Sequence, residues 1–331
     1  MIEVNRQETA EPGLRIGVLG ANGQLGRCLV RAVAEANDLE LCFGVTRDEI
    51  DLTASLEIGP WLDSLRSGLP DVVVNAAAHT HVDACESEVE LAYQTNASAP
   101  AEWARQLSER GVRFVHLSTD YVFRGDGDRP YREEDPTDPK TVYGSSKRAG
   151  EIAVQEMDPA ALIVRTSWVF GPGRNFVVAI LEQAARRRSG EIEGALRVVD
   201  DQHGAPTFAA DLAEALLELC RRGRRGGLES SAARGLLHLR NSEPVTWYGF
   251  ARVILDQAGY SDLGIDPVPS SAFETVAPRP AYSVLDCGRA AEMGIVLRPW
   301  SEALAGYLSG PDAPTTLLAY PHESPRREVS G

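Results

Sequence analysis

Three side chains near the middle of the chain have the types and spacing needed for proton transfer to a carbonyl oxygen. Tyr143 and Lys147 stand four residues apart, so they share one face if the segment is helical. A free phenol has a pKa of about 10, and a cation held one turn away favours the phenolate and lowers that pKa. We therefore expect Tyr143 to be the proton donor and Lys147 to tune its pKa.

The third side chain is Thr119, which ends a short apolar strand that begins near Val115. Its hydroxyl is expected to hydrogen-bond the same carbonyl oxygen. Tyr-x-x-x-Lys is common by chance, but lysine occurs here only at Lys140 and Lys147, and arginine is used everywhere else. The ammonium of Lys147 is more compact than the guanidinium groups that the chain uses elsewhere, and this difference favours a catalytic role for Lys147.

Composition limits the class of protein. The 331 residues are 43% hydrophobic and 24% charged, as in an ordinary globular protein with one large domain and a smaller lobe. The net charge of -15 argues against a nucleic-acid partner. No apolar run has the length of a membrane span, residues 1–13 do not resemble a signal peptide, and the cysteines have no paired spacing. We expect a cytoplasmic monomer or homodimer, with no membrane partner and no metal.

A glycine-rich loop lies between the first expected strand, 14–19, and a helix that runs to about Ala36. Such a loop allows backbone to approach a pyrophosphate, which then lies at the positive end of the helix dipole. The motif predicts a dinucleotide site formed by this loop. Its residues are Gly20, Asn22, Gly23, Gln24, Leu25 and Gly26.

The second expected strand, 39–45, ends without the acidic residue that would hold a ribose 2'-hydroxyl. Arg47 follows it and is interpreted either as a ligand for a 2'-phosphate, which favours NADPH over NADH, or as a solvated surface arginine. Asp51, which precedes Leu52, is interpreted either as a residue at the adenine side of the cofactor site or as the N-terminal cap of the following helix.

Two further segments carry candidate ligand contacts. The strand 71–74 leads to the small residues Ala76, Ala77 and Ala78, where a cofactor can pass close to backbone, and a helix is expected from about Val89 to Arg110. Trp168 follows the strand 161–166 and is interpreted either as a ring that stacks on a ligand or as a core side chain.

Regular alternation of strands and helices predicts an α/β fold, a doubly wound parallel sheet of the Rossmann type with ligands at the carboxyl ends of its strands. Shorter elements after residue 190 indicate a smaller C-terminal substrate lobe. We expect a polar leader at 1–13, a dinucleotide-binding domain at 14–190, a substrate lobe at 191–309 with some elements returning to the core, and a flexible tail at 310–331.

The chain resembles the extended short-chain dehydrogenase/reductases and, among them, is similar to the dTDP-4-dehydrorhamnose reductase family. The resemblance covers roughly residues 14–308 and is carried by the glycine loop and by these segments: 74–88, His116-Leu-Ser-Thr-Asp-Tyr-Val-Phe123, Tyr143-Gly-Ser-Ser-Lys147, 165–169, Asp201-Gln-His-Gly-Ala-Pro-Thr207 and 279–283. The segments around Thr119 and Gly204 are more specific than the loop.

The resemblance implies that Tyr143 donates the proton, Lys147 holds the nicotinamide ribose, and Thr119 polarises the C4 carbonyl of a dTDP-sugar. It also implies that Gly23 to Leu25, Asp51, Leu52 and Ala76 to Ala78 contact NADPH or NADH, and that Thr119, Asp120, Tyr143 and Trp168 contact the sugar. The product would be dTDP-L-rhamnose. Metal-bridged dimers are not expected, because Arg27 and Cys28 stand where such members carry a carboxylate.

Two other interpretations remain open at this stage. The chain could reduce another dTDP-4-keto-6-deoxyhexose for a specialised glycoside, since no residue excludes this. It could also be a non-catalytic nucleotide-binding regulatory subunit of the same superfamily, although the set Thr119, Tyr143 and Lys147 favours catalysis.

Overall fold

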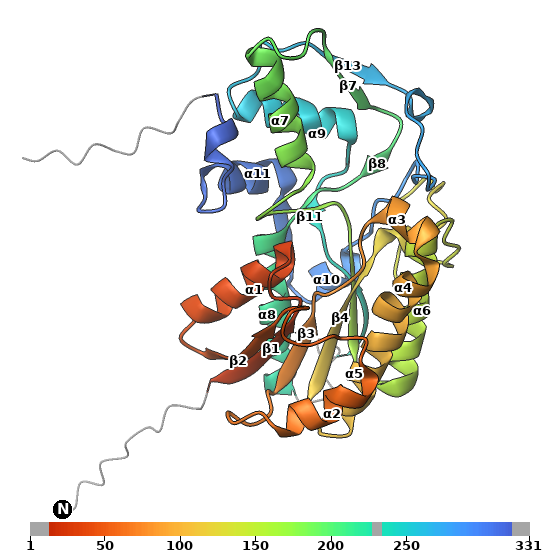
Figure 1. Ribbon diagram of the computed structural model, residues 1–331, viewed down its shortest axis with the longest axis vertical. Helices are drawn as coiled ribbons and strands as arrows, with labels where there is room; N and C mark the ends of the chain where they lie inside the picture. Colours follow the sequence, from red (N-terminus) through yellow and green to blue (C-terminus); the bar gives the residue numbers. More distant parts are fainter. Residues whose placement is uncertain (1–12, 227–233, 320–331) are drawn as a thin grey trace, which may run out of the picture.

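The computed structural model describes residues 13–226 and 234–319, and its centre is a six-stranded parallel sheet (Figure 1). The strand order is β10-β5-β4-β3-β1-β2. The strands are β1 (Leu14–Leu19), β2 (Leu39–Val45), β3 (Val72–Asn75), β4 (Arg113–Thr119), β5 (Leu162–Thr166) and β10 (Gly235–His238).

Both faces of the sheet are covered by helices, because successive side chains of its strands point to opposite sides. Val72 and Val74 pack with α1 (Gln24–Glu35) and α8 (Ala209–Gly226) on one face. Val73 packs on the other face with α2 (Ser55–Asp63), α5 (Ala99–Ser108) and α6 (Val142–Met157). The predicted doubly wound α/β class is therefore confirmed.

The strand order reverses at β1, which pairs with β2 on one side and β3 on the other. In an open α/β sheet, this switch point leaves a crevice at the carboxyl ends of the strands. The glycine loop after β1 and the alanines after β3 both lie there, and Gly20 N donates to Val45 O at the end of β2 over 2.9 Å.

A second hydrophobic core lies outside the sheet and forms the upper lobe in Figure 1. It contains α7 (Phe176–Arg188), α9 (Trp247–Gln257) and α11 (Trp300–Ser309). Short strand pairs connect these helices: β7 (Leu196–Val199) with β13 (Ile265–Val268), β6 (Val169–Phe170) with β9 (Thr207–Phe208), and β8 (His203–Gly204) with β12 (Val245–Thr246). Elements that return to the first core include α8, β10, α10 (Gly288–Glu292) and β14 (Leu297–Pro299), which pairs with β11 (Asn241–Ser242).

Two segments differ from expectation. The helix expected at 89–110 is interrupted by a π-helical turn at Gln94–Ser98, which separates α4 (Val89–Tyr93) from α5, and a further short helix, α3 (Val82–Ser87), precedes it. Residues 310–319, expected to be a flexible tail, instead pack on the second core, where Tyr260 donates its hydroxyl hydrogen to Leu317 O over 2.8 Å. Asp312 also pairs with Arg31 on α1 at 2.7 Å. The remainder of the expected leader and tail, residues 1–12 and 320–331, lies outside the described residues.

Within residues 13–226 and 234–319, none of the helices combines the length and the apolar character needed to cross a lipid bilayer.

Candidate active site

The side chain of Tyr143 is positioned by the first turn of α6. Thr141 caps this helix by accepting a hydrogen bond from Gly144 N at 3.0 Å. A Cβ at position 144 would collide with the carbonyl oxygen of Tyr121, so only glycine lets the helix approach the turn after β4 so closely. The rings of Tyr121 and Tyr143 consequently meet edge to face at 5.5 Å.

Tyr143 and Thr119 are brought together across the carboxyl end of β4. Burial raises the pKa of the Tyr143 phenol above its ordinary value, and a hydrogen bond with Thr119 lowers it in part. Contrary to the expectation that Lys147 lowers it, the pKa is raised, because burial outweighs the hydrogen bond with Thr119. The phenol therefore stays protonated at neutral pH, which is the state needed in a proton donor.

Lys147 lies one turn further along α6 and is only 2% exposed. Its Nζ donates to Leu117 O at 2.5 Å and lies 3.5 Å from His116 Nε2. Burial lowers the pKa of Lys147 to about 8, with Glu151 opposing the shift. The side chain is thus mostly charged at neutral pH, beside the buried edge of β4.

Asp120 is buried beside Thr119, whose Oγ1 donates to Asp120 Oδ1 over 3.0 Å. The other carboxylate oxygen, Oδ2, is buried and forms no hydrogen bond of good geometry in the described part of the chain, although the nearby Ser283 hydroxyl lowers the pKa of the carboxyl in part. Burial raises the pKa of Asp120 to about 6, so the group is a carboxylate at neutral pH. An unpaired buried acceptor of this kind fits a hydroxyl group of a ligand.

A cavity of about 380 Å³ occupies the crevice at the switch point. Gly20 adopts a φ of 79°, and a Cβ there would lie 2.8 Å from Ala77 N, so glycine is required for the turn. The cavity confirms that most of the expected cofactor residues lie together, and its lining adds Thr53, Leu91 and Thr95. The expected residues that line it are Gly20, Asn22, Gly23, Arg47, Asp51, Leu52, Ala76, Ala77 and Ala78.

The other expected cofactor residues do not line this cavity. Leu25 is buried in the first core, and Gly26 lets α1 pack against the carbonyl oxygen of Gly20. Gln24 has a buried amide oxygen without a partner among the described residues. Thr95 was not among the expected cofactor residues, because it lies within a helical segment, in the π-helical turn, and not at the end of a strand.

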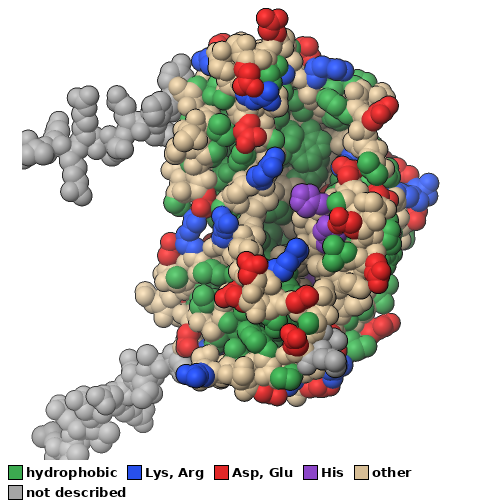
Figure 2. All heavy atoms as spheres, viewed as in Figure 1, with side chains coloured by type: hydrophobic (Ala, Val, Ile, Leu, Met, Phe, Trp, Pro, Cys, Tyr) green, Lys and Arg blue, Asp and Glu red, His purple; other side chains and the backbone are tan. Residues whose placement is uncertain are grey.

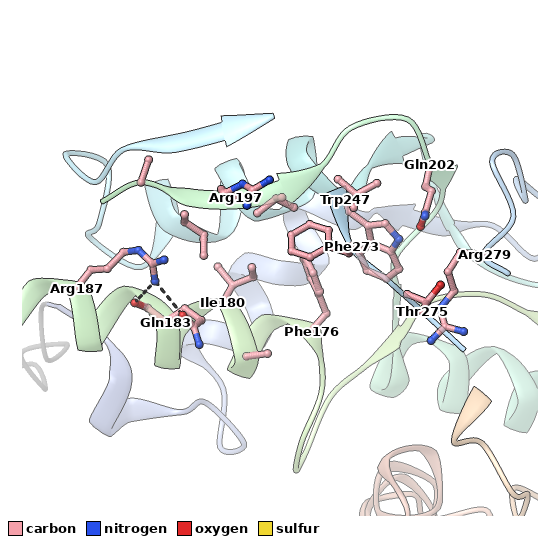
Figure 3. Close-up of a pocket in the computed structure, with 15 residues that line it drawn as sticks. Phe176, Ile180, Gln183, Arg187, Arg197, Gln202, Trp247, Phe273, Thr275 and Arg279 are labelled. Atoms are coloured by element: carbon pink, nitrogen blue, oxygen red, sulfur yellow. Dashed lines mark hydrogen bonds between the residues drawn. The ribbon is translucent and has the colours of Figure 1, made fainter. Parts of the chain in front are cut away.

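A larger cavity of about 570 Å³ lies in the second lobe (Figure 3). Its walls are largely aromatic and aliphatic, with Phe176 and Ile180 from α7, Trp247 from α9, and Phe273 from the segment after β13. Three guanidinium groups border it, those of Arg187, Arg197 and Arg279. Flat apolar walls with nearby cations can hold a planar base and anionic phosphates. Of the residues that line this cavity, Gln202 and Arg279 belong to segments quoted above for the family resemblance.

Trp168 lines neither of these two cavities. It follows Thr166, the register partner of Thr119, with Ser167 between them. The indole is partly buried and stacks on Trp247, with ring centroids 3.4 Å apart and an angle of 6° between the planes. It is therefore neither a plain core side chain nor a free stacking surface.

The molecular surface is hollowed between the two lobes, and histidine, lysine or arginine side chains border the hollow (Figure 2). A glycine turn at the sheet's switch point, with Thr119, Tyr143 and Lys147 gathered at the neighbouring strand end, defines a dinucleotide-binding protein of the short-chain dehydrogenase/reductase class.

Comparison with known proteins defines the family more narrowly. A family model described as the RmlD substrate binding domain matches residues 14–311, and the chain belongs to this family. The dTDP-4-dehydrorhamnose reductase of Mycobacterium tuberculosis is 40% identical over 92% of this chain and 95% of its own length. A Streptomyces antibioticus protein named probable dTDP-4,6-dihydroxy-2-methyloxan-3-one 4-ketoreductase is 39% identical over 94% of this chain and 98% of its own.

A solved structure of a dTDP-4-dehydrorhamnose reductase is also similar to this chain. The dTDP-4-dehydrorhamnose reductase from Bacillus anthracis, in complex with NADP, superposes with a TM-score of 0.77 and 31% identity. The match covers 89% of this chain and 99% of that chain.

Proposed function

We propose that this protein reduces the C4 keto group of dTDP-4-dehydro-β-L-rhamnose to give dTDP-L-rhamnose, with NADPH as the reductant. This is the last step of dTDP-rhamnose biosynthesis. The observation that carries the proposal is the placement of the Tyr143 phenol and the Thr119 hydroxyl at the end of β4, on the same sheet edge as the dinucleotide cavity. The family membership supplies the substrate class.

Side chains of the protein supply the proton that the reduction requires. Bound NADPH would supply a hydride to C4 of the sugar. Tyr143, held protonated by burial, donates its proton to the carbonyl oxygen as that oxygen gains negative charge. On substrate binding, the Thr119 hydroxyl turns its one hydrogen from Asp120 Oδ1 to the same carbonyl oxygen, and the two donors stabilise the developing alkoxide. One hydride and one proton together convert the ketone into a secondary alcohol.

Lys147 acts as a buried cation beside the reacting groups. Its ammonium carries hydrogens beyond the one donated to Leu117 O, and these are suited to the hydroxyls of the nicotinamide ribose.

The second cavity is the proposed site of the dTDP group. The aromatic walls of Phe176, Trp247 and Phe273 fit the thymine ring, and the guanidinium of Arg279 fits the diphosphate. With the nucleotide there, the sugar extends toward Asp120, whose unpaired Oδ2 accepts a hydrogen bond from a sugar hydroxyl.

Arg47 supports the choice of NADPH. It lines the dinucleotide cavity and forms no salt bridge with a carboxylate of the described residues, so its guanidinium is free for a 2'-phosphate. The described cysteines are all free thiols, which supports a reducing, cytoplasmic location.

The direct test is oxidation of NADPH, followed by absorbance, on addition of a dTDP-4-keto-6-deoxy sugar. Consumption of NADPH with formation of dTDP-L-rhamnose supports the proposal. No consumption, with tight nucleotide binding retained, would favour the regulatory-subunit interpretation instead.

A second candidate function rests on the Streptomyces antibioticus relative, whose name specifies another dTDP-linked ketosugar. In that case the chain reduces a different dTDP-4-keto-deoxyhexose with the same chemistry. Comparing kcat/KM for the two sugars, and identifying each product by NMR, separates the two enzymes.

A further inference from the structure

A buried carboxylate lies one helical turn beyond Lys147, and the proposed reaction does not use it. This group belongs to Glu151, which is only 1% exposed. A buried carboxylate without partners is strongly disfavoured, because it loses the hydration of its charge. Glu151 instead accepts hydrogen bonds from three side chains, and two of these are arginines. Its negative charge is therefore compensated inside the protein.

The three donors come from three elements of the fold. Arg165 on β5 donates from Nε and Nη2 to the two oxygens of Glu151, each over 2.7 Å. Ser118 on β4 donates to Oε1 at 2.6 Å, and Arg148 on α6 donates to Oε2 at 3.0 Å. Ser118 and Arg165 are register partners in the sheet, so they reach the carboxylate side by side. One carboxylate thus ties α6 to both strands.

Arg165 is fixed by further contacts, which in turn fix Glu151. The guanidinium carbon lies 4.9 Å from the ring centroid of Phe123, and Nη1 lies 3.4 Å from His238 Nε2. Burial, together with the charge of Arg165, lowers the pKa of His238 to about 3, so this imidazole adds no charge at neutral pH. The carboxylate of Glu151 is consequently held in one place.

Lys147 and Glu151 share one face of α6 and contact consecutive residues of β4. Lys147 Nζ donates to Leu117 O, and Glu151 accepts from Ser118, the next residue of the strand. Both charged groups therefore lie against the same stretch of strand inside the protein, where charges interact more strongly than in water. The carboxylate favours the charged form of Lys147, in opposition to burial.

The other ionisable groups around Lys147 act differently. His116 Nε2 lies 3.5 Å from Nζ, but burial and the charge of Lys147 hold the pKa of this imidazole well below its ordinary value, so it is neutral. Asp120 acts on the phenols of Tyr121 and Tyr143. Further ionisable groups on the elements that pack on α6 are Asp83, Cys85 and Glu86 on α3, Glu90 and Tyr93 on α4, and Glu102 and Arg105 on α5.

We propose that Glu151 is a positioning residue, which fixes α6 against β4 and β5 and whose charge keeps Lys147 as an ammonium that donates to the nicotinamide ribose. An ammonium has three hydrogens, of which one is given to Leu117 O, whereas a neutral amine has only two. Loss of the charge therefore weakens the contact with the cofactor. This inference rests on the proposed function for the role of Lys147, and it adds the group that maintains that role.

The titration of Lys147 can be measured directly, because the chain contains only two lysines. In protein labelled with carbon-13 at lysine Cε, the exposed Lys140 is an internal control, and Lys140→Arg assigns the two NMR signals. In the wild type, the Lys147 signal should titrate with a pKa of about 8. In Glu151→Gln, which keeps the shape but removes the charge, the midpoint should fall by at least about one pH unit.

Two further variants separate charge from packing. Ser118→Ala removes one hydrogen bond to Glu151 but keeps its charge, so the Lys147 midpoint should stay unchanged. If Glu151→Gln does not fold, because Arg165 loses its buried partner, Glu151→Gln/Arg165→Met replaces both members of the pair and should show the same fall.

The affinity for NADPH provides a second readout. Its Kd, measured by fluorescence titration at a series of pH values, should rise above about pH 8 in the wild type, as Lys147 loses its charge. In Glu151→Gln the same rise should begin at a lower pH, displaced by as much as the NMR midpoint of Lys147.

Each result has a distinct meaning. Equal Lys147 midpoints in the wild type and Glu151→Gln overturn the proposal, and so does a fall of the same size in Ser118→Ala. A lowered midpoint with an unchanged pH profile of the NADPH affinity overturns the link to the ribose. A wild type that reduces no dTDP-4-keto sugar, while its Lys147 midpoint depends on Glu151, contradicts the proposed function and supports the role of Glu151.

Discussion

At the scale of single residues, burial decides the protonation states of the site. The same desolvation keeps Tyr143 protonated, lowers the pKa of Lys147 and raises that of Asp120, because each shift favours the neutral form. The proposed reaction needs a neutral phenol, a charged ammonium and a charged carboxylate. These three states coexist only over a limited range of pH.

Replacing Tyr143 by Phe should lower kcat at least about a hundredfold, the scale of lost general acid catalysis, and leave NADPH affinity unchanged. Tyr143 does not line the dinucleotide cavity, which is the reason to expect intact binding. Steady-state rates and calorimetry test both statements. Tyr260→Phe, which removes a hydroxyl bonded to Leu317 O, is a matched control. Near-native turnover in Tyr143→Phe would refute the role of proton donor.

The pH profile of kcat/KM should be bell-shaped. Asp120 has a raised pKa of about 6, so it loses its charge as the pH falls below that value. Lys147 has a lowered pKa of about 8, so it loses its charge as the pH rises above that value. Activity should therefore be greatest between the two. Asp120→Asn should abolish the acid limb of the profile and keep the alkaline limb; an unchanged acid limb would show that another group titrates there.

Arg47→Ala should weaken NADPH binding more than NADH binding, because only NADPH carries the 2'-phosphate. Dissociation constants for both cofactors, measured by fluorescence titration, give the ratio. Arg66→Ala serves as control, since Arg66 is exposed and does not line the cavity. Equal losses for the two cofactors would rule out the phosphate contact.

At the scale of elements, the site depends on how closely α6 packs on the π-helical turn. Asn96 lies in this turn and is fully buried. Its side chain donates to Ser146 Oγ on α6 and accepts from His79 N on the loop after β3, at 3.0 and 2.8 Å. One amide therefore connects the helix of Tyr143 to the loop that follows the alanines of the cavity at the switch point.

Gly150→Ala tests this packing. A Cβ at position 150 would collide with the carbonyl oxygen of Asn96, so α6 must shift. We expect a loss of about 1–3 kcal/mol in the free energy of unfolding, as for other overpacked sites, together with reduced kcat. Urea denaturation measures the first effect. At Gly264 the nearest atom to an added Cβ is 3.3 Å away, and Gly264→Ala should be much milder. Equal stabilities of the two variants would contradict the argument.

At the scale of the whole molecule, the two lobes have separate hydrophobic cores and separate cavities. The dinucleotide cavity is lined by residues 20–95 and the larger cavity by residues 176–279. The lobes are joined by contacts such as the pair of Asp83 on α3 with Arg279, 2.6 Å apart. Arg279 also lines the larger cavity, so this contact links the substrate lobe to the sheet domain.

Each ligand should therefore stabilise the protein by itself. At about one hundred times its Kd, NADPH or dTDP should each raise the free energy of unfolding by about 2.7 kcal/mol. Thermal unfolding with each ligand, and with both, measures the shifts. The shift caused by dTDP should be the same in Arg47→Ala as in the wild type. Absence of any shift with dTDP would contradict the assignment of the larger cavity.

The α/β class, the glycine turn at Gly20 and the placement of Tyr143 and Lys147 on one helix face could be predicted from the amino-acid sequence. These features depend on local rules, namely side-chain period, turn conformation and helical spacing. The direction of the Tyr143 pKa shift and the walls of the larger cavity became apparent only in the folded chain. Both depend on which distant segments of the chain come into contact and on how fully these segments exclude water. The spacing of residues that are neighbours in the sequence does not specify either of these.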